Sequence, residues 1–89
     1  MIQVTVKYLM VFSQITNKRK EVIPINEGMT LQDLIDVLYK KYGRKFKKAF
    51  GEDLGHMSAL ITINTEVKDK SYILKPDDEI LISHIVGGG

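Results

Sequence analysis

The segment from residue 30 to residue 43 reads TLQDLIDVLYKKYG, and it predicts an α-helix with one apolar face. The apolar residues that recur at helical spacing are Leu31, Leu34, Ile35, Leu38 and Tyr42. Thr30 is suited to cap the helix, Asp33 stands in the capping-box position, and Gly43 is placed to end it. An apolar helix face must be covered, and the other segments offer only a sheet to cover it.

Two extended segments precede this helix. Residues 2–8 alternate apolar and polar side chains, which predicts a half-buried strand. Residues 21–26 predict a second strand, which should lie at a sheet edge because Pro24 has no N–H to donate. The polar segment 13–20 predicts a turn, so the two strands are expected to form a hairpin.

The segments after the helix complete the pattern. The spacing of Phe46, Ala49 and Phe50 favours a short second helix. The elements predicted beyond it are a buried strand at 60–65, a short strand or turn at 66–69, a turn at 75–78 and a last strand at 79–86. This order predicts an α+β protein of the β-grasp (ubiquitin-like) type, a mixed four- to five-stranded sheet packed on one main helix. Its first and last strands should be parallel neighbours at the centre.

Length and composition are consistent with this assignment. The 89 residues make one domain, in which residues 1–86 form the β-grasp unit and residues 87–89 a flexible tail. There is no cysteine, which excludes disulfides and a cysteine nucleophile within the chain. No apolar run approaches the roughly 20 residues that span a bilayer, and a cytoplasmic location is expected.

Three consecutive glycines, Gly87, Gly88 and Gly89, follow the predicted last strand. Because glycine has no side chain and is costly to hold still, they should form a thin, mobile thread that ends in a carboxylate. Such a thread suits a narrow tunnel in a partner enzyme, with Gly87 and Gly88 inside it and Gly89 at the reacting end. The alternatives are a disordered end without a role and a remnant of cloning.

The chemistry open to that carboxylate is restricted. It becomes reactive only when a good leaving group, such as AMP from ATP, is attached, and it can then accept sulfur or form an amide. The glycines at 28, 43, 51 and 55 are scattered, and none begins a phosphate-binding G-x-x-x-x-G-K pattern. We therefore expect a co-substrate without catalytic residues or a bound cofactor, with ATP used by a separate adenylating enzyme.

Several short motifs resemble the ubiquitin-like sulfur carriers over nearly the whole chain. They are Met1-Ile2-Gln3-Val4, Thr30-Leu31-Gln32-Asp33-Leu34, Ile63-Asn64, Leu74-Lys75-Pro76-Asp77-Asp78-Glu79-Ile80 and the closing glycines. This group includes the small subunit of molybdopterin synthase, the thiamine-pathway sulfur carrier and the ubiquitin-related modifier of tRNA thiolation. The resemblance implies adenylation and thiocarboxylation of Gly89 by an E1-like enzyme, with a sulfur donor as a further partner.

The resemblance leaves the branch of the family open. Residues 33–36, 72–74 and 82–88 resemble the ubiquitin-related modifier, which implies a tRNA thiolation enzyme as acceptor and target-protein lysines as a second destination. The molybdopterin-synthase subunit usually has prolines before its final glycines and apolar side chains on its outer sheet face. The matching outer positions here are Lys7, Glu66 and Ser83. These polar positions weaken the molybdopterin assignment without excluding it, so a large molybdopterin-synthase subunit is kept as an alternative partner. An inert binding module of the same fold is the alternative function.

Other candidate sites are weaker. His56 and His84 lie far apart in the sequence, and a metal site is not expected. Asp77-Asp78-Glu79 predicts a solvated turn rather than a cation site. The cluster of Lys40, Lys41, Arg44, Lys45, Lys47 and Lys48 predicts a solvated helix face, or else a docking surface for an acidic partner or RNA. The formal charge of +2 is too small to predict direct nucleic-acid binding.

Overall fold

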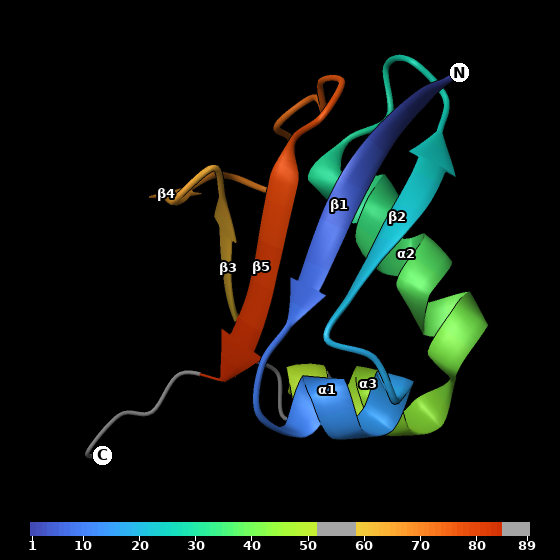
Figure 1. The fold of residues 1–89 in the computed structure, drawn as a ribbon, viewed down its shortest axis with the longest axis vertical. Coiled ribbons are helices and arrows are strands. Elements are labelled where there is room, and N and C mark those ends of the chain that lie inside the picture. The colour runs from blue at the N-terminus through green and yellow to red at the C-terminus, as the bar shows by residue number, and fades with distance from the viewer. Residues whose placement is uncertain (52–58, 85–89) are drawn as a thin grey trace.

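A mixed sheet forms the centre of the computed structural model, which describes residues 1–51 and 59–84. In these residues the strand order is β2-β1-β5-β3-β4 (Figure 1). The strands are β1 (Ile2–Tyr8), β2 (Lys20–Ile25), β3 (Ala59–Ile63), β4 (Glu66–Val67) and β5 (Glu79–His84). β1 pairs in parallel with β5, while the β1–β2 and β3–β5 pairs are antiparallel. The predicted β-grasp fold is confirmed, including the edge position of the strand that contains Pro24.

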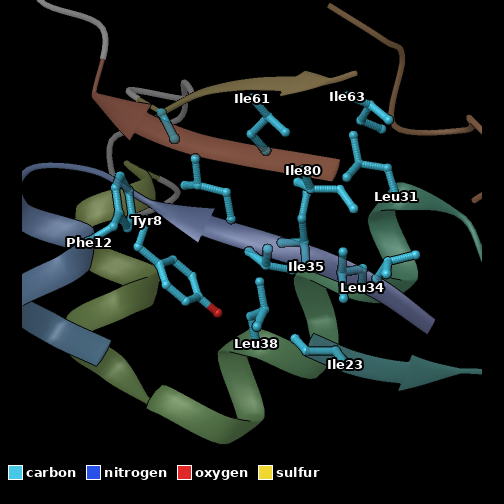
Figure 2. Close-up of a cluster of buried hydrophobic side chains, with 14 of the residues drawn as sticks. Tyr8, Phe12, Ile23, Leu31, Leu34, Ile35, Leu38, Ile61, Ile63 and Ile80 are labelled. Carbon is cyan, nitrogen blue, oxygen red and sulfur yellow. The ribbon is translucent and has the colours of Figure 1, made fainter. Parts of the chain in front are cut away.

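The helix α2 (Leu31–Tyr42) packs across one face of this sheet (Figure 1). Its capping box is formed as predicted: the Asp33 N–H donates to Thr30 Oγ1 at 3.2 Å, and the Thr30 N–H donates to Asp33 Oδ2 at 3.0 Å. The helix ends at Gly43, where φ is 80°. The buried side chains between helix and sheet include Ile23, Leu34, Ile35, Leu38, Ile61, Ile63 and Ile80 (Figure 2). Val4 and Val6 of β1 belong to the same buried core.

The connection between β1 and β2 corrects the prediction of a simple turn at residues 13–20. It contains a short helix, α1 (Val11–Thr16), which Asn17 ends in a left-handed conformation. Phe12 is fully buried, and the buried hydroxyl of Thr16 donates to the Phe12 carbonyl at 2.9 Å. Tertiary burial of Phe12 therefore stabilises a helix too short to form alone.

The predicted second helix is confirmed as α3 (Arg44–Phe50). Its two buried residues join an aromatic cluster at the end of the molecule where β5 finishes. The Phe46 ring lies 5.3 Å from Phe12 and 5.7 Å from Tyr42, measured between centroids, and the Phe50 ring lies 5.6 Å from Phe12. These edge-to-face and stacked contacts hold α1 and α3 together at the end of the sheet where β5 finishes.

In the turn that leads into β5, Asp77 and Glu79 are exposed as predicted, but Asp78 is not, because it is only 4% exposed. Its carboxylate accepts hydrogen bonds from Asn64 Nδ2 at 2.8 Å, the Tyr72 hydroxyl at 3.0 Å and the Lys75 N–H at 2.8 Å. Asn64 follows β3, whereas Tyr72 and Lys75 belong to the connection that leads into β5, so the buried carboxylate joins these two segments at the start of β5. A buried carboxylate requires such partners to offset its lost hydration.

Candidate functional site

The sheet fixes the position from which residues 85–89 continue. Ile80 and Ile82 anchor β5 in the core, and its two neighbours pair with it on both sides. His84, the last described residue, is still in register with Ala59 of β3. The predicted site residues Gly87, Gly88 and Gly89 lie outside the described residues. The chain therefore enters that segment from a strand held at the centre of the sheet.

Exposed apolar side chains lie beside the end of β5. Leu9 and Met10 are 45% and 56% exposed, and the Leu9 N–H donates to the Ile82 carbonyl of β5 at 3.0 Å. Met10 has a positive φ of 55°, and its carbonyl accepts a hydrogen bond from Ser13 Oγ at 2.7 Å. An open groove of about 490 Å³ is lined by Lys7, Tyr8, Leu9, Met10, Ser13, Arg19 and Lys20. The sequence analysis missed this surface because it assigned no element to residues 9–12 and only a turn to residues 13–20.

A polar cluster lies on the inner side of the same end. Glu21 of β2 accepts hydrogen bonds from Lys18 at 2.8 Å, from Lys41 at 3.2 Å and from the Tyr42 hydroxyl. The Tyr8 ring is buried in the core (Figure 2), and its hydroxyl has no hydrogen-bond partner among the described residues. Burial, and then the negative charge of Glu21, raise the pKa of Tyr8, so this phenol stays protonated and does not serve as a base.

The sheet face opposite α2 differs in part from the face expected by resemblance. Lys7 and Ser83 alternate with buried residues and lie on this face, as expected. Glu66 does not belong to it, because Glu66 pairs with the inward-facing Ile63. The exposed apolar side chains on this face are Val22, Leu60 and Val67, at 58%, 42% and 72%. The outer face is therefore less polar than the three matched positions suggested.

The six predicted basic residues are all exposed, and they cover the end of α2 and the solvent side of α3. Lys41 is paired with Glu21, and the Lys47 ammonium lies over the Tyr39 ring, 5.7 Å from its centroid. A second hollow, of about 410 Å³, is lined by Tyr39, Lys40, Gly43, Arg44 and Lys47. This surface is cationic, and its chemistry suits an anionic partner.

The remaining predictions concern metals and membranes. Among residues 1–51 and 59–84, no cluster of three histidine, aspartate or glutamate side chains is arranged to hold a metal ion. His56 and the side chain of His84 lie outside the described part of the structure. Within the same ranges, no helix combines the length and apolar character needed to cross a membrane.

Solved structures from archaea share this fold over the whole chain. A protein assigned as molybdopterin converting factor subunit 1 from Pyrococcus furiosus has 27% identity and a TM-score of 0.82, with 97% of this chain and 100% of that chain covered. The small archaeal modifier protein 1 of Methanosarcina acetivorans has 24% identity and a TM-score of 0.77, covering 100% and 98%. SAMP1 of Haloferax volcanii has 19% identity and a TM-score of 0.78, covering 98% and 99%. At 24% and 19% identity, the last two similarities establish only that the fold is shared.

A comparison with family models identifies the family. The search of curated proteins gave no match. The model described as the ThiS family matches residues 6–89, nearly the whole chain and including the glycine tail. The chain therefore belongs to the ThiS family, within the ubiquitin-like sulfur-carrier superfamily.

Proposed function

We propose that this chain is a sulfur carrier whose working group is the Gly89 carboxylate, and that a separate E1-like enzyme activates it. The observation that carries the proposal is the position of β5. This strand is paired on both sides at the centre of the sheet as far as Ile82, and its pairing with β3 continues to His84. A rigid domain that presents a short glycine tail suits a partner that must recognise the domain and bring the terminal carbon to a nucleotide. The family match, which runs to residue 89, supports the same assignment.

The proposed first step is adenylation. A carboxylate oxygen of Gly89 attacks the α-phosphorus of ATP, the bond to the β-phosphate oxygen breaks, and pyrophosphate leaves. The product is an acyl adenylate, in which AMP is a good leaving group. Three glycines keep side chains away from the reacting carbon during this close approach.

The proposed second step transfers sulfur to the tail. A hydrosulfide supplied by a sulfur donor attacks the acyl carbon, the carbon–oxygen bond to AMP breaks, and the thiocarboxylate of Gly89 remains. That sulfur is then donated, as in tRNA thiolation or molybdopterin synthesis. The name of the Pyrococcus furiosus relative favours an acceptor of the molybdopterin type.

Protein modification is a second proposed outcome of the same activated state. A target lysine amine attacks the acyl carbon, AMP leaves, and an isopeptide bond forms with loss of one proton. The names of the archaeal structural relatives, small archaeal modifier proteins, favour this use. Both outcomes require the same adenylate, so one chain can serve both.

The test is the intact mass of the purified chain after incubation with ATP, its E1-like enzyme and a sulfur donor. The expected product is heavier by the difference between one sulfur and one oxygen atom, and the change should map to the peptide that contains Gly89. A chain with an amidated terminus is the matched control and should stay unchanged. An inert binding module would give no mass change with either chain.

A further inference from the structure

The exposed cations at the end of α2 and on α3 form a surface that the proposed chemistry does not use. We define the basic surface as Lys40, Arg44, Lys45, Lys47 and Lys48. All five side chains are exposed, and none forms an ion pair with another described residue. By contrast, Lys41 is held by Glu21 at 3.2 Å. Four of the five cations lie on the seven-residue helix α3, where like charges three or four positions apart repel each other. This arrangement lowers stability slightly and favours an anionic partner.

The basic surface lies at the end of the molecule where β5 finishes. Helix α1 contacts both β5 and α3, and Figure 1 shows α1, α3 and the end of β5 together at that end. Residues 85–89 can reach at most about 18 Å beyond β5 even when fully extended. An enzyme that binds Gly89 must therefore approach this end of the domain, on which the basic surface also lies.

The aromatic residues near this surface argue against single-stranded nucleic acid as the partner. Such ligands are usually held by exposed aromatic faces on which bases stack. Here Phe46 and Phe50 are buried, the Tyr39 ring is covered by Lys47, and the Tyr42 ring carries Lys41 at 5.7 Å from its centroid. Four of the five cations are lysines, which act as point charges and suit scattered carboxylates.

We propose that the basic surface docks on an acidic surface of the enzyme that activates Gly89, beside the opening that receives the tail. This inference rests on the proposed function. The contact steers the domain toward the enzyme and orients the tail, and its strength falls as salt rises. Because ion pairs between the basic surface and the enzyme would be exposed to solvent, they affect the rate of association more than the chemical step.

The experiment compares two charge-reversal pairs in ATP-dependent activation by the purified E1-like enzyme, measured as pyrophosphate release. Arg44→Glu/Lys48→Glu reverses the basic surface. Lys70→Glu/Lys75→Glu makes the same change in net charge at exposed positions near the start of β5. At low ionic strength we expect the first pair to lose roughly tenfold or more in kcat/KM, mainly through KM, and the control pair to lose less than about twofold. Near 1 M salt the first pair should match the unmodified chain, because the screening length falls to about 3 Å.

The alternative outcomes separate failure of the docking proposal from failure of the proposed function. If the unmodified chain is activated and the two pairs lose activity equally, only net charge matters and the docking proposal is wrong. The proposal also fails if neither pair changes KM, or if the first pair instead abolishes salt-dependent RNA binding while activation is unaffected. Failure of the unmodified chain to be activated would contradict the proposed function itself. Thermal melting confirms that both pairs fold, and Arg44→Gln/Lys48→Gln should show an intermediate loss.

Discussion

The two ends of β5 are built in opposite ways. At its start, the buried carboxylate of Asp78 accepts three hydrogen bonds, one from Asn64 after β3 and two from the connection that leads into β5. At its finish, the core is aromatic, and the surface carries exposed Leu9 and Met10 together with cations that have no acid partner among the described residues. The hydrogen bonds at the start of β5 stabilise the fold, whereas the exposed groups at its finish are available to bind a partner. Substitutions at the first end should therefore lower stability, and substitutions at the second should lower activity.

Removal of Gly89 should have the largest effect on activity. The truncated chain lacks the terminal glycine, so we expect no thiocarboxylate by intact mass. Its melting temperature should stay within a degree or two, since exposed positions typically change stability by under about 0.5 kcal/mol. A large decrease in melting temperature would mean that the tail packs on the domain. The finish of β5 would then contribute to stability as well as to activity.

Leu38→Ala should have the largest effect on stability. Leu38 is fully buried between α2 and the sheet, and truncation of such a side chain costs about 2–5 kcal/mol. Val37→Ala is the matched control on the same helix, because Val37 is 38% exposed and should lose much less. Urea denaturation at 25 °C measures both. Equal losses would show that α2 does not pack on the sheet as described.

Asp78→Asn should destabilise the start of β5 by about 1–3 kcal/mol, because an amide group replaces a carboxylate oxygen among three donors. Asp77→Asn is the control. Asp77 is exposed and has a φ of 65°, a conformation that asparagine also adopts readily. Chemical denaturation should separate the two variants, and the folded fraction of Asp78→Asn should keep its activation by the E1-like enzyme. Equal stability of the two variants would remove the assigned role of Asp78.

The pH dependence at Glu21 should be the smallest effect. Burial raises its pKa, but the hydrogen bonds from Lys18, Tyr42 and Lys41 outweigh burial and leave the pKa below its usual value. The stabilisation is therefore present above the unfolded pKa of about 4.3 and is lost as the pH falls through the folded pKa. Glu21→Gln should be less stable than the unmodified chain by under about 1 kcal/mol at pH 7, and the difference should shrink below pH 4. A difference that does not depend on pH would contradict this ion-pair account.

Local sequence signals predicted the elements whose stability is mainly local. Thr30 and Asp33 specify the start of α2, and Pro24 specifies an edge strand. Helix α1 was missed because its stability depends on burial of Phe12 against Phe46, which lies far along the chain. The spacing of Phe12 and Thr16, four positions apart, was the one feature of the sequence that could have indicated this helix.

The same distinction applies to the side chains around β5. Burial of Asp78 depends on Asn64, fourteen positions away, and no local pattern reports such a contact. The basic surface was visible in the sequence as a cluster, whereas its position near the end of β5 required the fold. The glycine tail was a prediction from sequence and family resemblance, and it remains a prediction.

The mass of the protein isolated from its own cells tests the central claim most directly. The account predicts a fraction of chains that end at Gly89 and are heavier by one oxygen-to-sulfur exchange, located in the C-terminal peptide. Chains that continue past Gly89 without trimming, or that never carry sulfur, AMP or an isopeptide bond at that residue, would contradict it.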